Sequence, residues 1–284
     1  MGQIENMINR DLVITSRQNP SVKRLCFLLE KKGRESSGLF RFDGVKLFCE
    51  AVSCGIEIES VYVRESSADS LEDRLAKELG SLSRDRIICV SDSVFEKISE
   101  EKSPEGIITV AKHIDKFRKI VKIENTDIPK TGESVLLLES IRDPGNLGTI
   151  FRSAAALGID RIVMSSDCAD VYNPRTIRAA MGAIFRVSLC ALDSGLMPEY
   201  ITRLRGCGRR VFAAALDEKA AVLGEFEMSA GDSFVIGNEG HGLSRDVIDA
   251  CDSSVIIPMQ AGCESLNAAA ASVILMWEMK KAND

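Results

Sequence analysis

The amino-acid sequence predicts an α/β protein that consists of two domains. Short apolar runs alternate with helical segments along most of the chain, which is the pattern of strands and helices that pack in layers. Gly, Ala, Val, Ile and Leu are plentiful whereas aromatic residues make up only 5% of the sequence, so a β-sandwich is disfavoured. A length of 284 residues suffices for two domains.

Charge and cysteine usage argue against several classes of protein. The net charge of −6 disfavours a protein that coats nucleic acid, although it leaves room for a local basic surface. No apolar stretch approaches the ~20 residues of a membrane span, and the first residues lack the apolar core of a signal peptide. The nine cysteines form no CxxC pair and stand beside only two histidines, so we expect no metal site, no membrane association and a reducing, cytoplasmic location.

Residues 1–112 form the first predicted domain. Its expected strands lie at residues 13–14, 38–42, 58–63, 86–90 and 106–112, and its expected helices at 21–32, 45–54, 71–79 and 91–98. Ser21 is the expected cap of the first helix, and Gly55 ends the second. This alternation indicates a mostly parallel sheet.

Residues 113–133 are predicted to be a linker, because periodicity fails there and the stretch is charged and contains Pro129 and Gly132. The second domain, residues 134–284, resumes the alternation. Its expected strands lie at 135–139, 161–165, 186–189, 210–215, 233–237 and 254–257, and its expected helices at 147–157, 174–182, 197–206, 244–250 and 266–280.

Three segments of the second domain join apolar strands to polar turns. The first, residues 136–158 (LLLESIRDPGNLGTIFRSAAALG), breaks at an Asp-Pro-Gly turn and resumes as a helix expected to begin near Asn146 or Leu147, with Asn146 as a possible cap. Arg152 follows at i+6, on roughly the same side of the helix as Asn146. Taken alone, a cap and a peripheral arginine explain this segment better than a site does.

The second segment, residues 234–244 (FVIGNEGHGLS), places three glycines among Asn238, Glu239 and His241 after a buried strand, and Ser244 is expected to cap the next helix. Such a loop lets backbone N–H groups face a ligand, and it matches neither a Walker loop nor a dinucleotide-binding fingerprint. A purely structural turn would not need three glycines beside a carboxylate, so we favour a binding loop. His241 is better explained as a hydrogen-bond donor of the loop than as a general base.

The third segment, residues 255–279 (VIIPMQAGCESLNAAAASVILMWEM), runs from a buried strand through a loop of small residues into a long helix. Ser265 and Asn267 stand at the start of this helix, either as caps or as groups that point to the same end of the sheet as the second segment. The alanines at 268–271 favour close packing of the helix. Because ligands of open α/β sheets bind at the carboxyl ends of strands, the three segments are predicted to meet there.

In this order and spacing, NxGxxxR, GNEGxGLS and IPM followed by ESLN resemble the SpoU branch of the SPOUT RNA methyltransferases. The resemblance covers residues 134–284. Nearer the front of the chain, ITSRQNPSVKRL and RFDGVKLFCEA resemble the L30e-like RNA-binding domain of members that act on ribosomal RNA. The resemblance implies a parallel-sheet SPOUT domain whose residues 233–280 form a deep trefoil knot, preceded by a smaller L30e-like α/β domain. It also implies a homodimer with active sites near the interface.

The resemblance further implies S-adenosylmethionine as the methyl donor. The residues expected to bind it are Ala214, Ala215, Gly237, Asn238, Gly240, Ile257, Met259, Ser265 and Leu266. The residues that match the catalytic positions of the family are Asn146, Arg152, Glu239, Ser265 and Asn267.

The implied chemistry is transfer of a methyl group to a ribose 2′-hydroxyl. Alignment of the hydroxyl oxygen with the S–CH₃ bond can supply roughly 7–11 kcal/mol of the barrier. The resemblance implies that the arginine removes the proton of the hydroxyl. A guanidinium is a poor base in most settings, so we interpret Arg152 as the group that binds the target phosphate and ribose and lowers the pKa of the hydroxyl, with proton transfer to Arg152 itself as the alternative. Glu239 is expected to hold Arg152 by a charge-assisted hydrogen bond, while Asn146 fixes the geometry.

Basic residues in residues 12–25 and 173–189 are candidates for contacts with RNA phosphates. They are Arg17, Lys23, Arg175, Arg178 and Arg186. Two positions depart from the family pattern: Ala180 stands where many relatives have serine, and Ala261 stands where the family has glycine. Neither departure removes a catalytic group.

Ribosomal RNA is the predicted substrate, because the L30e-like domain is present, and transfer RNA is the alternative. A protein of the same fold that binds RNA or assists ribosome assembly without catalysis is a further hypothesis, which the complete set of catalytic positions disfavours. An unrelated nucleotide-binding enzyme built on residues 237–242 is disfavoured because the chain has no Walker or Rossmann signature.

Overall fold

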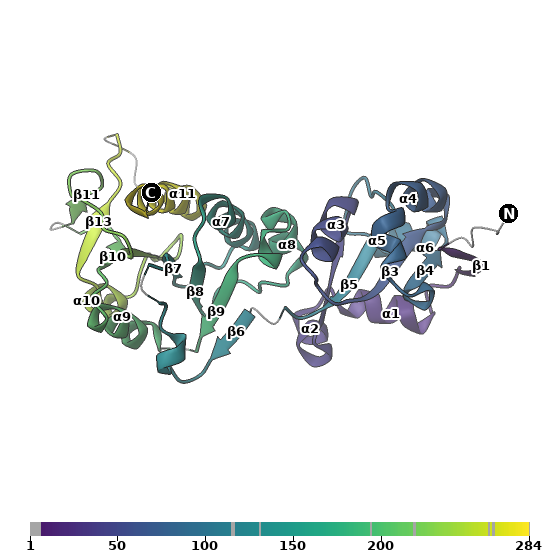
Figure 1. Ribbon diagram of the computed structural model, residues 1–284, viewed down its shortest axis with the longest axis horizontal. Helices are drawn as coiled ribbons and strands as arrows, with labels where there is room; N and C mark the ends of the chain where they lie inside the picture. Colours follow the sequence, from purple (N-terminus) through teal and green to yellow (C-terminus); the bar gives the residue numbers. More distant parts are fainter. Residues whose placement is uncertain are drawn as a thin grey trace. The chain divides into compact units, whose positions relative to one another are not determined.

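The computed structural model describes residues 7–114, 117–130, 132–193, 195–217, 220–260, 262 and 265–283. The chain divides into two units (Figure 1). The first contains residues 7–114 together with Tyr172–Phe185, and the second contains the other described residues. Tyr172–Phe185 thus packs with the first unit although it lies between two strands of the second in the sequence. Ala261, one of the two departures from the family pattern, lies outside the described residues.

The first unit is built on a five-stranded sheet of order β1-β4-β3-β5-β2. Its strands are β1 (Asn9–Ile14), β2 (Leu39–Asp43), β3 (Ile58–Arg64), β4 (Ile87–Val90) and β5 (Ile107–Lys112). β4 pairs parallel with β1 and β3, whereas β5 pairs antiparallel with β3 and β2. The sheet is therefore mixed, and the expectation of a mostly parallel sheet is wrong. Alternation of strands and helices does not fix strand direction, and β5 begins at the end of the sheet where β4 stops.

Helices and short 3₁₀ turns connect these strands. They are α1 (Pro20–Phe27), α2 (Lys31–Ser37), α3 (Val45–Ser53), η1 (Glu65–Ser67), α4 (Ala68–Arg74), α5 (Ala76–Gly80), η2 (Arg84–Arg86), α6 (Asp92–Ile98), α8 (Pro174–Ala180) and η4 (Ala183–Phe185). α1 and α6 pack on the sheet through a shared apolar core. The N-cap of α1 is Asn19, whose Oδ1 accepts a hydrogen bond from the Ser21 N–H at 2.9 Å, so Ser21 is not the cap.

The second unit is built on an eight-stranded sheet of order β11-β13-β10-β12-β7-β8-β9-β6, and every pair of neighbours is parallel. Its strands are β6 (Phe117–Ile120), β7 (Val135–Leu138), β8 (Arg161–Ser165), β9 (Ser188–Leu192), β10 (Val211–Ala214), β11 (Ala221–Val222), β12 (Ser233–Ile236) and β13 (Ser253–Ile256). β7 and β12 are buried at every position, as expected for central strands covered on both faces.

β6 lies inside the stretch predicted to be a linker, and the prediction missed this strand. β6 forms an edge of the sheet and pairs with β9 alone, so Arg118 and Lys119 remain exposed and only Ile120 enters the core. Hydrophobic periodicity consequently gives no signal there. Arg118 is held by the buried Asp127 carboxylate at 2.7 Å, in the 3₁₀ turn η3 (Asn125–Asp127) that leads toward β7.

Helices cover both faces of this sheet (Figure 1). α9 (Met197–Gly206) and α10 (Arg245–Ala250) pack on one face through a core that includes Leu137, Val163 and Val235. α7 (Pro144–Leu157) and α11 (Ala268–Asn283) lie against each other on the opposite face. No helix among the described residues is long and apolar enough to cross a membrane.

Candidate active site

The carboxyl ends of β10, β12 and β13 border a cavity of about 530 Å³. This volume lies in the range of cavities that bind small molecules and cofactors. All nine residues predicted to bind the methyl donor line the cavity: Ala214, Ala215, Gly237, Asn238, Gly240, Ile257, Met259, Ser265 and Leu266. Glu239 and His241 line it as well. The second and third segments therefore meet at the end of the sheet where the sequence predicts a site.

The Gly237–Gly242 loop closes on itself by backbone hydrogen bonds. The Asn238 N–H donates to the Gly242 carbonyl at 3.1 Å, and the Gly242 N–H donates to the Asn238 carbonyl at 2.9 Å. A Cβ at Gly237 would lie 2.4 Å from the Gly242 carbonyl carbon, and Gly242 has a positive φ of 69°. These two glycines are needed by the loop itself. Gly240 has no such requirement, because a Cβ there would lie 3.5 Å from the nearest atom, which is Asn238 Oδ1.

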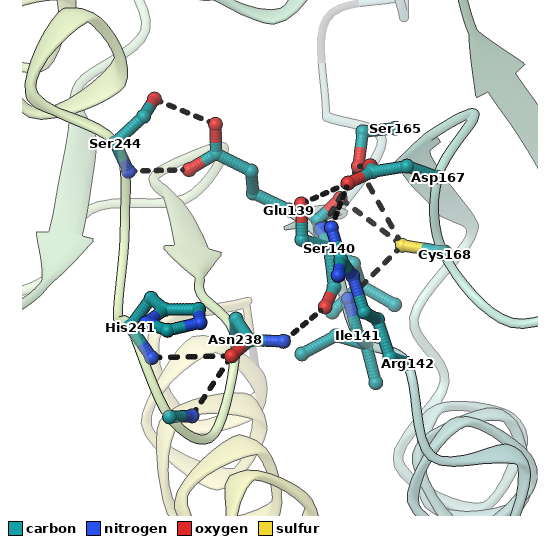
Figure 2. A network of polar contacts seen from close by, with 12 residues as sticks. Glu139, Ser140, Ile141, Arg142, Ser165, Asp167, Cys168, Asn238, His241 and Ser244 are labelled. Carbon is teal, nitrogen blue, oxygen red and sulfur yellow. Dashed lines mark hydrogen bonds and ion pairs between the residues drawn. The ribbon is translucent and has the colours of Figure 1, made fainter.

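The Asn238 side chain forms hydrogen bonds to the backbone of its own loop and to the turn after β7 (Figure 2). Asn238 Oδ1 accepts hydrogen bonds from the backbone N–H groups of Gly240 at 2.8 Å and His241 at 3.1 Å. Asn238 Nδ2 donates to the Ser140 carbonyl at 2.8 Å, which joins the loop to the turn after β7. Asn238 therefore supports the loop structurally in addition to lining the cavity. The bond from His241 is made by its backbone N–H, so the role predicted for its side chain stays a prediction.

A second connection joins the same two segments one residue earlier in the turn (Figure 2). The Glu139 carboxylate accepts hydrogen bonds from the Ser244 N–H at 2.8 Å and the Ser244 hydroxyl at 2.6 Å. Ser244 precedes α10, but its hydroxyl makes no capping bond to that helix. The expectation that Ser244 caps the helix is thus met by position only, because Glu139 engages its hydroxyl.

A chain of three polar side chains links all three predicted segments. Asn146 Nδ2 donates to Glu239 Oε1 at 2.7 Å, and Asn267 Nδ2 donates to Asn146 Oδ1 at 3.0 Å. Asn267 Oδ1 in turn accepts from the N–H groups of Ala269 and Ala270, which caps α11. The Asn146 amide therefore bridges the loop after β12 and the start of α11. We call Glu239, Asn146 and Asn267 the polar chain.

Asn146 is free to make these contacts because it is not the cap of α7. The helix begins at Pro144, and Asp143 is its N-cap, with Oδ1 accepting from the Asn146 N–H at 2.8 Å. The predicted start near Asn146 or Leu147 is therefore late by about one turn. Proline favours the first helical position, so the Asp-Pro-Gly sequence begins the helix here.

Arg152 lies on α7, where its side chain is exposed. Among the described residues, its guanidinium makes no hydrogen bond or ion pair, and the Glu239 carboxylate bonds to Asn146. The expected contact between Glu239 and Arg152 is absent among the described residues, and Glu239 Oε1 accepts a hydrogen bond from the Asn146 amide instead. Arg152 is accordingly available to an external anion.

The candidate RNA contacts occupy both units. Arg17 and Lys23 are exposed beside and on α1, and Arg175 and Arg178 are exposed on α8, all in the first unit. Arg186 is exposed and belongs to the second unit. Ala180, at the family's serine position, is fully buried at the end of α8.

Two buried thiols of the second unit are poor nucleophiles. Burial raises the pKa of Cys168 to about 11 and that of Cys251 to about 12. A thiolate is the reactive form of cysteine, so both groups are inert near neutral pH. Covalent catalysis through these two thiols is therefore disfavoured.

The parallel sheet, the cavity at its carboxyl edge and the adjoining polar chain define an α/β enzyme domain of the SPOUT methyltransferase class. Residues 133–277 match the SpoU rRNA Methylase family, and residues 19–109 match the MRM3-like substrate binding domain. The chain belongs to the SpoU rRNA methylase family.

Relatives match along nearly the whole chain. The 23S rRNA (guanosine(2553)-2′-O)-methyltransferase RlmP of Bacillus subtilis is 29% identical over 269 residues, which cover 94% of this chain and 98% of the relative. The 23S rRNA (uridine(2479)-2′-O)-methyltransferase of Streptomyces viridochromogenes is 28% identical, with 93% and 90% covered. A crystal structure of an rRNA methyltransferase from Sinorhizobium meliloti superposes with a TM-score of 0.79 at 28% identity, with 94% and 96% covered. An AdoMet-bound structure from the same organism gives 0.78 at 25% identity, with 97% and 98% covered.

The sequence did not single out the residues that fix the turn after β7. Glu139 and Ser140 follow an apolar strand and read as ordinary polar positions at a strand end. Their partners, Ser244 and Asn238, lie about 100 residues away in the chain, at separations of 105 and 98. Local periodicity gives no signal for contacts of this kind.

Proposed function

We propose that this protein transfers a methyl group from S-adenosylmethionine to a ribose 2′-hydroxyl of ribosomal RNA. The observation that supports the proposal most directly is the convergence of the predicted donor-binding residues on one cavity, with the polar chain at Glu239 on its lining. The names of the Bacillus and Streptomyces relatives, which act on 23S rRNA, favour ribosomal RNA over transfer RNA.

The residues of the cavity fit the chemistry of such a donor. Ile257, Met259 and Leu266 offer apolar surface for a flat aromatic base, and the loop around Gly240 offers backbone polar groups. The absence of a side chain at Gly240 leaves that backbone accessible. When bound there, S-adenosylmethionine would supply a methyl group attached to a positively charged sulfur.

The polar chain and Arg152 divide the remaining work. Arg152 binds the phosphate and ribose of the target nucleotide and stabilises negative charge that develops on the hydroxyl oxygen. Asn146 holds Glu239 and Asn267 in fixed orientations, and Ser265 stands on the wall of the cavity. The carboxylate of Glu239 is the group of this chain suited to receive a proton, directly or through water.

The assembly that we propose is a homodimer formed by the second unit. α11 exposes Val273 (37%) and Trp277 (49%) one turn apart on one side. An apolar face of this kind on a helix beside the active site suits a second copy of the same chain. Substitution of Trp277 by Glu is expected to yield a monomer in sedimentation analysis.

We also propose that residues 233–280 form the trefoil knot implied by the family. β13 is separated from β7 by β10 and β12, yet α11, which follows β13, packs against α7, which follows β7. Ile257, Met259, Ser265 and Leu266, which all lie between β13 and α11 in the sequence, line the cavity at the carboxyl edge of the sheet. The free state of all eight described cysteines is consistent with a cytoplasmic enzyme.

The test of the proposed function is incubation of the protein with methyl-labelled S-adenosylmethionine and separately purified ribosomal and transfer RNA. We expect label in ribosomal RNA. Label confined to transfer RNA would reassign the substrate. Tight RNA binding without label in either pool would identify a non-catalytic RNA-binding protein. Arg152→Ala should lower kcat about 10²–10³-fold, the range seen when a group that stabilises developing charge is removed.

A further inference from the structure

The turn after β7 has an unusual backbone conformation at Ser140, a residue that contacts the Gly237–Gly242 loop. Ser140 has a φ of 55°, and it is one of two non-glycine residues in the described parts of the chain with a positive φ. A positive φ is unfavourable for residues other than glycine unless surrounding contacts stabilise it. The Ser140 carbonyl is the acceptor for Asn238 Nδ2, so this conformation determines where that acceptor points.

The loop after β8 supplies the groups that hold Ser140 (Figure 2). The Ser140 N–H donates to Ser165 Oγ at 2.9 Å, and the Ser140 hydroxyl donates to the Asp167 carboxylate. Ser165 Oγ also donates to Asp167 Oδ1 at 2.6 Å. Asp167 therefore fixes the hydroxyl of Ser140 directly and the N–H of Ser140 through Ser165.

Asp167 also interacts with Arg142, two residues after Ser140. Arg142 Nη2 lies 3.4 Å from Asp167 Oδ2, so one carboxylate gathers three side chains. Partial burial raises the pKa of Asp167, but the hydrogen bonds from Ser140, Ser165 and Arg142 outweigh this effect, and the pKa lies below its ordinary value. Asp167 is consequently a charged acceptor at every pH at which the enzyme would work.

The Asn238 side chain connects this turn to the Gly237–Gly242 loop. Asn238 Nδ2 donates to the Ser140 carbonyl, while Asn238 Oδ1 accepts from the N–H groups of Gly240 and His241. All residues of the Gly237–Gly242 loop line the cavity. Glu239, which lies between Asn238 and Gly240, reaches Asn146. A rotation of the peptide group between Ser140 and Ile141 would turn the Ser140 carbonyl away from Asn238 Nδ2. We expect the loop that carries Glu239 to shift when this bond is lost.

We propose that Asp167 is a positioning residue for methyl transfer, which holds Ser140 in its left-handed conformation and thereby sets the Gly237–Gly242 loop. Asp167 does not line the cavity, so its effect passes through Ser140 and Asn238. The proposal rests on the proposed function, since the loop is assigned to the methyl donor.

The test compares Asp167→Ala, Asp167→Asn and the double variant Asp167→Ala/Ser140→Gly. Glycine adopts a positive φ without support, so it restores the backbone of the turn while the carboxylate stays absent. We expect Asp167→Ala to raise the Kd for S-adenosylmethionine, measured by calorimetry, about tenfold, in line with losses of outer groups that orient ligating residues. The double variant should return the Kd to within about threefold of wild type, and Asp167→Asn should lie between.

Asp249→Asn is the matched control, because it removes a carboxylate of the same unit that pairs with Arg245 on the exposed side of α10. Its Kd should equal that of wild type. An unchanged Kd in Asp167→Ala overturns the proposal. A loss that Ser140→Gly does not restore also overturns it, because a general loss of stability would not be cured by glycine at one backbone position.

Hydrogen exchange of the Gly240 and His241 amides, which donate to Asn238, separates this inference from the proposed function. Both amides should exchange faster in Asp167→Ala than in wild type and Asp249→Asn, whatever the ligand of the cavity. If wild type binds no S-adenosylmethionine, the proposed function fails while faster exchange would still support the positioning role. Unchanged exchange would exclude the role even if wild type binds the donor well.

Discussion

At the scale of single residues, Gly237 and Gly240 belong to one loop for different physical reasons. A Cβ at Gly237 would lie 2.4–2.6 Å from backbone atoms of Gly242 and Leu243, which cannot move without opening the loop. Gly237→Ala should therefore lower the free energy of unfolding by about 1–3 kcal/mol, the usual cost of overpacking. Urea denaturation measures this change.

Gly240→Ala is the comparison within the same loop. Its added Cβ meets only Asn238 Oδ1, at an ordinary 3.5 Å, so stability should change by less than about 0.5 kcal/mol. The Kd of Gly240→Ala for S-adenosylmethionine should nevertheless rise, because the methyl side chain of the new alanine would project from the cavity wall toward the donor. Equal destabilisation by the two substitutions would contradict the assignment of Gly237 to loop closure.

Asn146 offers a second test at this scale, because its amide has two separable contacts. Asn146→Ala loses both, whereas Asn146→Asp keeps an acceptor for Asn267 and places a second carboxylate against Glu239. Both variants should lower kcat about 10–100-fold, with a change in the free energy of unfolding of about 1 kcal/mol or less. Thr202→Ser on α9, where the exposed Thr202 hydroxyl donates to the Pro198 carbonyl at 2.9 Å, is the control. Wild-type kcat in Asn146→Asp would show that the bond to Glu239 is dispensable.

At the scale of elements, the start of α7 determines which side chains face the site. Asp143 Oδ1 caps the helix by accepting from the Asn146 N–H, which also fixes the backbone that presents the Asn146 amide. Asp143→Ala should reduce the free energy of unfolding by about 1 kcal/mol and Asp143→Asn by less, because asparagine is also a good cap. Thermal denaturation of the two variants measures the difference. Equal losses would indicate that the charge of Asp143, rather than its capping bond, matters.

Element prediction from the sequence succeeded where burial produces periodicity. The apolar run at residues 135–138 and the strands at 161–165 and 233–236 are central and buried, and their predicted positions agree with β7, β8 and β12 within a residue. β6 was missed because an exposed edge strand leaves charged side chains in the pattern. The helix predicted at 21–32 is two helices, α1 and α2, separated at residues 28–30, and an apolar stripe does not record such a break.

The sequence predicted which residues lie at the candidate site, but not the hydrogen bonds among them. The order and spacing of the three motifs led to nine residues that all line the cavity, because the motifs follow strands whose carboxyl ends meet at one edge of a parallel sheet. The pairing of Glu239 with Asn146 instead of Arg152 was not predicted, because spacing along the sequence does not show which of two side chains on one helix reaches a group on another segment. The supports at Ser140 and Asp167 arise from contacts between distant segments and have no local signal.

At the scale of the whole molecule, we expect the first unit to add contacts with RNA, while the second unit binds the methyl donor and, through Arg152, the target nucleotide. Arg17 and Lys23 lie in the first unit, which matches a substrate-binding domain over residues 19–109. The double substitution Arg17→Ala/Lys23→Ala should weaken binding of ribosomal RNA and reduce the slope of log K against log salt by about 0.7–0.9 for each lost phosphate contact. Its Kd for S-adenosylmethionine should not change. An RNA affinity and salt slope equal to wild type would remove both residues from the interface.

We propose that the cavity and the polar chain form one site that methylates a ribose oxygen. The most direct measurement is mass spectrometry of nucleosides from ribosomal RNA that wild type or Arg152→Ala has treated with methyl-labelled S-adenosylmethionine. We expect one labelled 2′-O-methylated nucleoside after treatment with wild type and a strongly reduced amount with Arg152→Ala. Label on a nucleobase, or equal labelling by the two proteins, would contradict it.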